Sequence, residues 1–200
     1  MVSWWRSGSR GGAGATVLRR AAVAAGLVVL LVGGGGVAVA GDPPSLSAAG
    51  PTSVTGTDAT AVFTIGTHTV RQIRYADGGT LRYTFRLTND GRLPVTVLGL
   101  ADHQQDSRLF TYTGLTGPDG STGLHLGPGD TGELTLALRM GGCETLSARA
   151  GAFVRDVVVR TERAGVLDDD VRVTLPEEVH TGSPREAFCP RSTATSRPPG

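Results

Sequence analysis

Histidine is the side chain most able to bind a metal ion or act as a base near neutral pH, and this sequence has few of them. The four histidines are far apart, and none occurs in the H-x-H or H-E-x-x-H spacing that presents two ring nitrogens to one ion. His103 and His125 could meet if their loops share an end of the fold. We predict no metal site and no cofactor, with a metal-binding accessory protein as an alternative. The histidines are His68, His103, His125 and His180.

A hydrolytic serine is the second chemistry that the sequence allows us to test. Ser121 lies between two glycines, but Asp119 occupies the position of the first glycine in a G-x-S-x-G nucleophile turn, and no helical pattern follows. Asp102, His103 and Ser107 lie in a polar connection, where exposed polar residues are the default. We interpret both segments as loops and expect no enzyme. A hydrolytic accessory protein of the envelope is the alternative.

The densest group of charges is the run Asp168-Asp169-Asp170. Carboxylates at a turn can bind calcium, but this run lacks the D-x-D-x-D-G spacing that wraps one ion. A solvated hairpin is the favoured interpretation. Arg160 or Arg163 would then partly neutralise the aspartates.

The first forty residues indicate where such groups would be positioned. Residues 21–40 contain no charged side chain, and one helix of that length rises about 30 Å, enough to cross a bilayer. Residues 1–20 form a basic head with no acidic residue, which predicts a cytoplasmic N-terminus and an extracellular remainder, tethered at the cell membrane by a single pass. The alternative is secretion after cleavage following Ala40, because Ala38 and Ala40 have the A-x-A spacing of a signal peptide.

The exported part has two cysteines and a mildly acidic balance. Cys143 and Cys189 are predicted to pair as a structural disulfide, because disulfides persist in oxidising compartments. Four of the nineteen basic residues, all of them arginine, precede Ala40, so fifteen remain against eighteen acidic residues. This composition gives no footprint for nucleic-acid binding.

Beyond residue 40 the chain is predicted to form one all-β domain between two irregular segments. Residues 41–60 are rich in Pro, Ser, Thr and Gly and predict a flexible stalk, and residues 190–200 predict a disordered tail. Residues 61–189 are assigned to the domain. Within it, apolar and polar residues alternate with a period of two, most clearly in 81–88, 134–140 and 171–175.

Weaker strand patterns and turn signals complete an immunoglobulin-like (Ig-like) antiparallel β-sandwich of about seven or eight strands. Turns are predicted at Asn89-Asp90-Gly91 and at Pro128-Gly129. The long connection 101–129 is the candidate binding surface, because loops on a rigid sandwich carry recognition. Its candidate residues are His103, Phe110, Tyr112 and His125, although its apolar side chains could instead complete the core. The weaker strands are 61–65, 68–75, 95–100, 109–113 and 152–161.

Several of these runs carry a resemblance to a group of proteins. The run 81–91 ends in Asn-Asp-Gly, Leu93-Pro94-Val95 follows, and Leu126-Gly127-Pro128-Gly129-Asp130 comes later. This layout resembles uncharacterised actinobacterial Ig-like ectodomains, in which a Pro-Gly turn leads into an amphipathic strand that ends near a cysteine. Cys143 and Cys189-Pro190 fit it. The resemblance covers about residues 62–190 and implies fold and location only.

Taken together, these observations predict a non-catalytic binding or spacer module outside the cell. Its partners would be the membrane, through residues 21–40, and an envelope protein or glycan, through the connection 101–129. A third interpretation is a structural subunit of a membrane complex, which would use the small residues Gly33 to Gly36 for helix packing.

Overall fold

The computed structural model describes residues 43–57, 59–76, 78–105, 107, 109–142, 151–163, 165–181 and 187–188. The basic head, the apolar segment 21–40, the tail 190–200 and both Cys143 and Cys189 lie outside these residues. No helix within the described ranges is long and apolar enough to span a membrane. The predicted membrane segment and the predicted disulfide therefore stay predictions.

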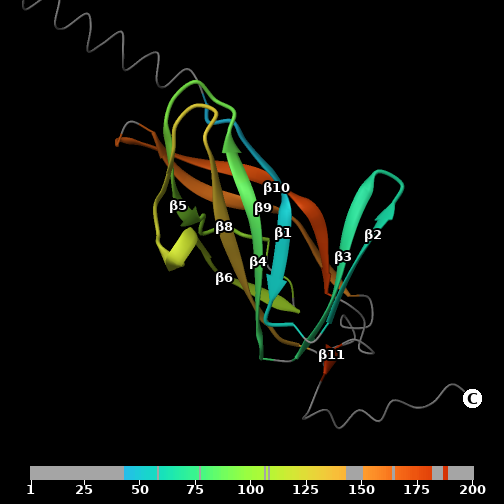
Figure 1. Cartoon of the computed structure of the whole chain (residues 1–200). Coiled ribbons are helices and arrows are strands. Elements are labelled where there is room, and N and C mark those ends of the chain that lie inside the picture. Colours follow the sequence, from blue (N-terminus) through green and yellow to red (C-terminus); the bar gives the residue numbers. More distant parts are fainter. Residues whose placement is uncertain are drawn as a thin grey trace, which may run out of the picture. The chain divides into compact units, whose positions relative to one another are not determined.

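The described chain is all-β and forms two sheets, as predicted for a sandwich. One sheet has four strands in the order β1-β4-β8-β6, and the other has seven in the order β11-β3-β10-β9-β5-β7, with β2 paired to β3 (Figure 1). The elements are β1 (Leu46–Thr55), β2 (Ala59–Ile65), β3 (His68–Ala76), β4 (Thr80–Asn89), β5 (Val95–Leu100), β6 (Phe110–Thr116), the 3-10 turn η1 (Pro118–Gly120), β7 (Leu124–Leu126), β8 (Thr131–Met140), β9 (Ala152–Arg163), β10 (Leu167–Thr181) and β11 (Ala187–Phe188).

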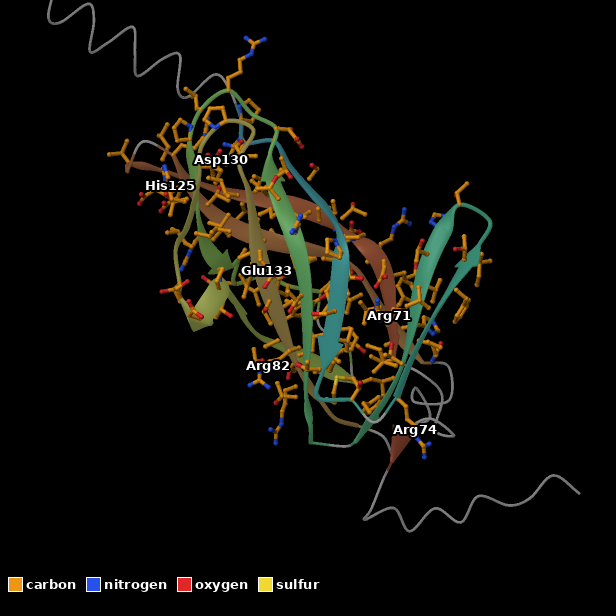
Figure 2. All side chains as sticks on the ribbon, in the orientation of Figure 1. Arg71, Arg74, Arg82, His125, Asp130 and Glu133 are labelled. Carbon is orange, nitrogen blue, oxygen red and sulfur yellow. The ribbon has the colours of Figure 1, made fainter. Side chains whose placement is uncertain are left out.

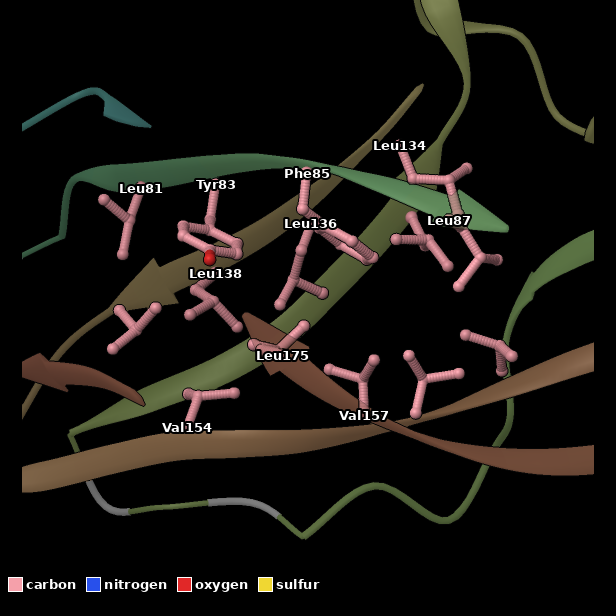
Figure 3. Close-up of a cluster of buried hydrophobic side chains, with 14 of the residues drawn as sticks. Leu81, Tyr83, Phe85, Leu87, Leu134, Leu136, Leu138, Val154, Val157 and Leu175 are labelled. Atoms are coloured by element: carbon pink, nitrogen blue, oxygen red, sulfur yellow. The ribbon is translucent and has the colours of Figure 1, made fainter. Parts of the chain in front are cut away.

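The core follows from the period-two pattern in the two central strands of the four-stranded sheet. Leu81, Tyr83, Phe85 and Leu87 of β4 are fully buried, whereas Arg82 and Arg86 between them are exposed. In β8 the buried side chains are Leu134, Leu136, Leu138 and Met140. Figure 3 shows the leucines and aromatic side chains of β4 and β8 packed against Val154, Val157 and Leu175 of the other sheet. Burial of each large apolar side chain contributes about 1.5–3 kcal/mol, so this layer holds the two sheets together.

The flexible stalk predicted for residues 41–60 is contradicted by the structure. Leu46–Thr55 forms β1, which pairs antiparallel with β4 from Leu46 opposite Asn89 to Thr55 opposite Arg82. Leu46, Ala48 and Val54 pack against the core. The half-buried positions Leu46, Ala48, Thr52 and Val54 keep a period of two across the register shift between Ala49 and Ser53. The strand was missed because most of its residues are small or polar, so the alternation carries little apolar contrast.

The structure also adds strands and a mixed topology to the predicted antiparallel sandwich. Eleven strands lie in the described residues instead of seven or eight. Two pairings are parallel, β10 with β3 and β11 with β3. Such pairings join segments far apart in the chain, so no local pattern could have predicted them.

The two predicted turns are present and are coupled through one buried side chain. Asp130 N–H donates to the Gly127 carbonyl (3.0 Å), and Gly129 has φ 78°, as a type II turn centred on Pro128-Gly129 requires. Asn89, 1% exposed, ends β4, and its Oδ1 accepts from Gly91 N–H (3.0 Å). Its Nδ2 donates to three carbonyl oxygens, those of Leu93 (2.9 Å), Leu126 (3.1 Å) and Gly127 (3.2 Å).

Candidate binding cleft beside strand β9

Three of the four predicted binding residues lie together. His103, Phe110 and Tyr112 line one open cavity of about 440 Å³, which is completed by Phe153, Arg155 and Arg172. We call it the β9 cleft, because Phe153, Val154, Arg155, Asp156 and Val158 of β9 form one of its walls. Residues 103–105 and 107, the start of β6 and Arg172 of β10 form the rest.

Gln104 fixes the connection against β9. Strand β5 ends at Leu100, and Ala101 N–H still donates to the Val158 carbonyl (2.9 Å). Beyond this point the Gln104 side chain replaces the backbone: its Nε2 donates to the Val158 carbonyl (2.5 Å), and its Oε1 accepts from Val158 N–H (3.1 Å). A primary amide carries the same donor and acceptor as a peptide group, so it extends the β5–β9 ladder by one step. No signal in the sequence distinguished Gln104 from any other polar loop residue.

Aromatic side chains from the two sheets provide the apolar part of the cleft. Phe110 is 3% exposed and belongs to the core, so one predicted binding residue completes the core as the alternative interpretation held. Tyr112 is half-buried and meets Phe110 edge to face, with ring centroids 5.7 Å apart. Phe153 is 59% exposed and stacks on His180 at 6.1 Å. Exposed and half-exposed rings beside polar groups are typical of recognition surfaces.

The charged groups of the cleft are mostly basic. Arg155 and Arg172 are exposed and form no ion pair with any residue that the structure describes. Asp156 is engaged, because its Oδ1 accepts from the Thr174 hydroxyl (2.6 Å). His103 Nδ1 lies 3.5 Å from Asp170 Oδ2, and both side chains are well exposed. Two arginines without acidic partners therefore remain available to a ligand.

A second groove adjoins the β9 cleft. It has a volume of about 550 Å³ and is lined by the end of β5, by residues 112–116 of β6 and by Arg160. Gln104 and Tyr112 line both cavities. A ligand longer than one cavity could therefore contact the second while it remains in the first.

His125 lies apart from these residues. It belongs to β7, where it pairs with Thr96 of β5, and its Nδ1 lies 3.3 Å from the Thr96 hydroxyl. It lines neither cavity. In the described part of the chain, no three His, Cys, Asp or Glu side chains gather in a way that could hold a metal ion.

The other candidate residues have structural partners. Asp168, Asp169 and Asp170 follow the first residue of β10, and Asp169 pairs with Arg163 through Nε (2.9 Å) and Nη2 (2.7 Å). Arg163 was one of the two arginines predicted to neutralise this run. Ser121 donates its hydroxyl hydrogen to the Pro118 carbonyl (2.9 Å) at the end of η1, which agrees with its interpretation as a loop residue.

One part-buried polar cluster was missed by the sequence reasoning. Arg71 of β3, labelled in Figure 2, binds Glu177 of β10 through Nε–Oε2 (2.6 Å) and Nη2–Oε1 (3.0 Å), with both side chains 11% exposed. Thr52 of β1 donates to Glu177 Oε1 (2.9 Å) and accepts from Arg71 Nη2 (3.0 Å). Arg71 Nη1 also donates to Thr60 of β2 (3.4 Å). The cluster joins strands of both sheets.

Tyr83 lies beside this cluster, and the charges of the cluster shift the pKa of its hydroxyl. Burial, and then the negative charge of Glu177, raise the pKa of the Tyr83 hydroxyl, and Arg71 acts in the opposite direction. The hydroxyl makes no hydrogen bond of ordinary geometry with any described residue, although Thr52 and the Glu177 backbone are close enough to lower its pKa slightly. Tyr83 is therefore a neutral phenol over the physiological pH range.

No protein-family model matches the chain, and no curated protein matches it. Among solved structures, the cupredoxin domain of amoB from Nitrosocaldus yellowstonii matches with a TM-score of 0.26 and 12% sequence identity, over 60% of this chain and 65% of that domain. The chain thus spans just under two thirds of that domain, and a likeness at this level supports no inference about function.

Proposed function

We propose that this chain is a non-catalytic binding module that acts outside the cell. In this proposal residues 21–40 tether an Ig-like sandwich to the membrane, and a disulfide between Cys143 and Cys189 stabilises it. The sandwich captures an envelope protein or glycan in the β9 cleft. The tether and the disulfide are supported by the sequence pattern described above, and the ligand site by the geometry of the cleft.

The observation that carries this proposal is the composition of the β9 cleft. Rings from two sheets, Tyr112 and Phe153, lie beside Arg155 and Arg172, which have no acidic partner among the described residues. Aromatic side chains and arginines are enriched where proteins bind partners, because each adds a large contact area or several directed donors. Ser107 and His103 both line the cleft, but no hydrogen bond joins them. The Ser107 hydroxyl oxygen instead accepts from Leu109 N–H (3.1 Å), which favours binding over catalysis.

The test is capture of envelope material by the purified full-length chain. Arg172→Glu should reduce capture at least about tenfold, because it replaces a group with several hydrogen-bond donors by a carboxylate that only accepts, and the carboxylate also repels an anionic ligand. Arg82→Glu is the matched control, because Arg82 is an exposed strand arginine on the four-stranded sheet (Figure 2). Equal loss in both variants, or no reproducible capture by the unmodified chain, would refute the proposal.

A further inference from the structure

The exposed hydrophobic side chains of the domain are concentrated in one edge strand. Val62 (49% exposed), Phe63 (42%) and Ile65 (60%) lie in β2, and only Phe153 and Val166 are comparable among the other described residues. Strand β2 pairs with β3 alone, and β11 pairs with β3 beyond the end of β2, at Tyr75 and Ala76. Figure 1 shows β2 as the outer strand of its hairpin.

The open edge of β2 has unused hydrogen-bonding capacity at defined residues. Its hairpin has a two-residue connection, 66–67, closed by the pair Ile65 and His68, with φ 60° at Gly66. In such a hairpin the closing pair is hydrogen-bonded, so Ile65 and Phe63 direct their backbone groups towards β3. Thr60, Val62 and Thr64 then direct their N–H and C=O groups to the open edge, where no described strand pairs with them.

Natural edge strands usually carry features that prevent such pairing. Charged side chains, prolines and bulges are the common ones. The sequence of β2, ATAVFTI, has no charged residue and no proline, and its pairing with β3 runs without a register shift. An uncharged edge strand of this kind is open to a second strand.

The sequence of β2 is also complementary to itself. If two copies pair antiparallel with Val62 on the two-fold axis, Val62 faces Val62, Thr60 faces Thr64, and Ala61 faces Phe63. The bulky phenylalanine thus meets a small side chain, and no like charges meet. In this register the hydrogen-bonded pairs are formed by Thr60, Val62 and Thr64. These are the same residues whose backbone N–H and C=O groups point to the open edge. A two-fold symmetric interface needs one surface patch that is complementary to itself in this way.

We propose that β2 is a homodimerisation edge, at which two copies of this chain pair antiparallel about Val62 and join their seven-stranded sheets. The occupant of the edge is a second copy, because the register above satisfies both copies with the same residues. This proposal is independent of the ligand-binding function, since β2 contributes no residue to the β9 cleft.

The first test is the oligomeric state of the full-length purified chain by sedimentation velocity over a range of concentrations. The unmodified chain should dimerise, and Val62→Lys should weaken dimerisation at least about tenfold, because it places two ammonium groups on the axis. Val166→Lys is the matched control, since Val166 is 78% exposed and lies between β9 and β10. A monomeric unmodified chain, or equal dimerisation by Val62→Lys, would overturn the proposal.

A charge-exchange pair of variants tests the register itself. Thr60→Glu combined with Thr64→Glu places carboxylates opposite each other twice and should abolish the dimer. Thr60→Glu combined with Thr64→Lys places opposite charges there and should restore it, although both variants alter the same two positions. Circular dichroism checks that both remain folded. If the two variants dimerise equally, the register is wrong.

Cross-linking in intact cells excludes dimerisation through another part of the chain. With a short bismaleimide, Val62→Cys should give cross-linked dimers, because the two copies of this position lie about 5.5 Å apart in the proposed register. Val166→Cys should give few. Equal yields at the two positions would show that β2 is not the interface.

Discussion

Replacing Asn89 by alanine should destabilise the domain more than any other change of one polar side chain in the loop region at this end of β4. Asn89 is 1% exposed, and its amide serves the carbonyls of Leu93, Leu126 and Gly127 as well as Gly91 N–H. A buried polar group that loses its partner costs about 1–3 kcal/mol. With two or more groups left without the amide, we expect a loss of about 2–4 kcal/mol, which lowers Tm by about 5–15 °C.

The assay is urea unfolding followed by far-ultraviolet circular dichroism. Thr88→Val is the matched control, because Thr88 precedes Asn89 in β4 and its hydroxyl makes an exposed hydrogen bond with Thr131 (2.8 Å). That variant should change the free energy of unfolding by less than about 0.5 kcal/mol. If Asn89→Ala cost less than about 1 kcal/mol, the buried amide would not be the link between β4 and the 127–130 turn, and the reasoning would be refuted.

Two further predictions concern the cluster between the sheets. Glu177→Gln leaves the part-buried Arg71 guanidinium without its counter-charge and should lower the free energy of unfolding by about 2–4 kcal/mol in urea titrations. Asp156→Asn, at an exposed hydrogen bond, is the control and should change it by less than about 0.5 kcal/mol. Equal effects would contradict a structural role for the ion pair. Burial raises the pKa of Tyr83, so the folded chain holds this proton more tightly than the unfolded chain, and stability should fall above about pH 10 at up to about 1.4 kcal/mol per pH unit. Tyr83→Phe should remove that slope in unfolding titrations at alkaline pH, and an unchanged slope would assign it to other groups.

The strands that could be predicted from the sequence are those with one buried and one exposed face. In β4 and β8 each apolar side chain enters the core and each polar one meets water, so the period of two is preserved. β1 was missed because most of its residues are small or polar, although its half-buried residues keep the period of two across a register shift. The parallel pairing of β3 with β10 joins residues about a hundred positions apart, which no local pattern encodes.

The candidate site was predicted in part for a similar reason. His103, Phe110 and Tyr112 come from one connection, so their proximity was within reach of the sequence. Arg155 and Arg172 enter the cleft from β9 and β10, and only the tertiary arrangement shows that they lie there. His125 belongs to the same connection but lies apart from them, because it follows η1 and pairs with β5.

The Arg71 cluster has a consequence for how self-association and folding depend on each other. Arg71 contacts Thr60 in the edge strand, Thr52 in the four-stranded sheet and Glu177 in the larger sheet, so the hairpin cannot shift without disturbing these contacts. The binding free energy of a partner that binds only the ordered hairpin therefore adds to the free energy of unfolding of the whole domain. If two copies pair through β2 as proposed, the melting temperature should rise with protein concentration, and loosening the cluster should weaken the pairing through the contact of Arg71 with Thr60.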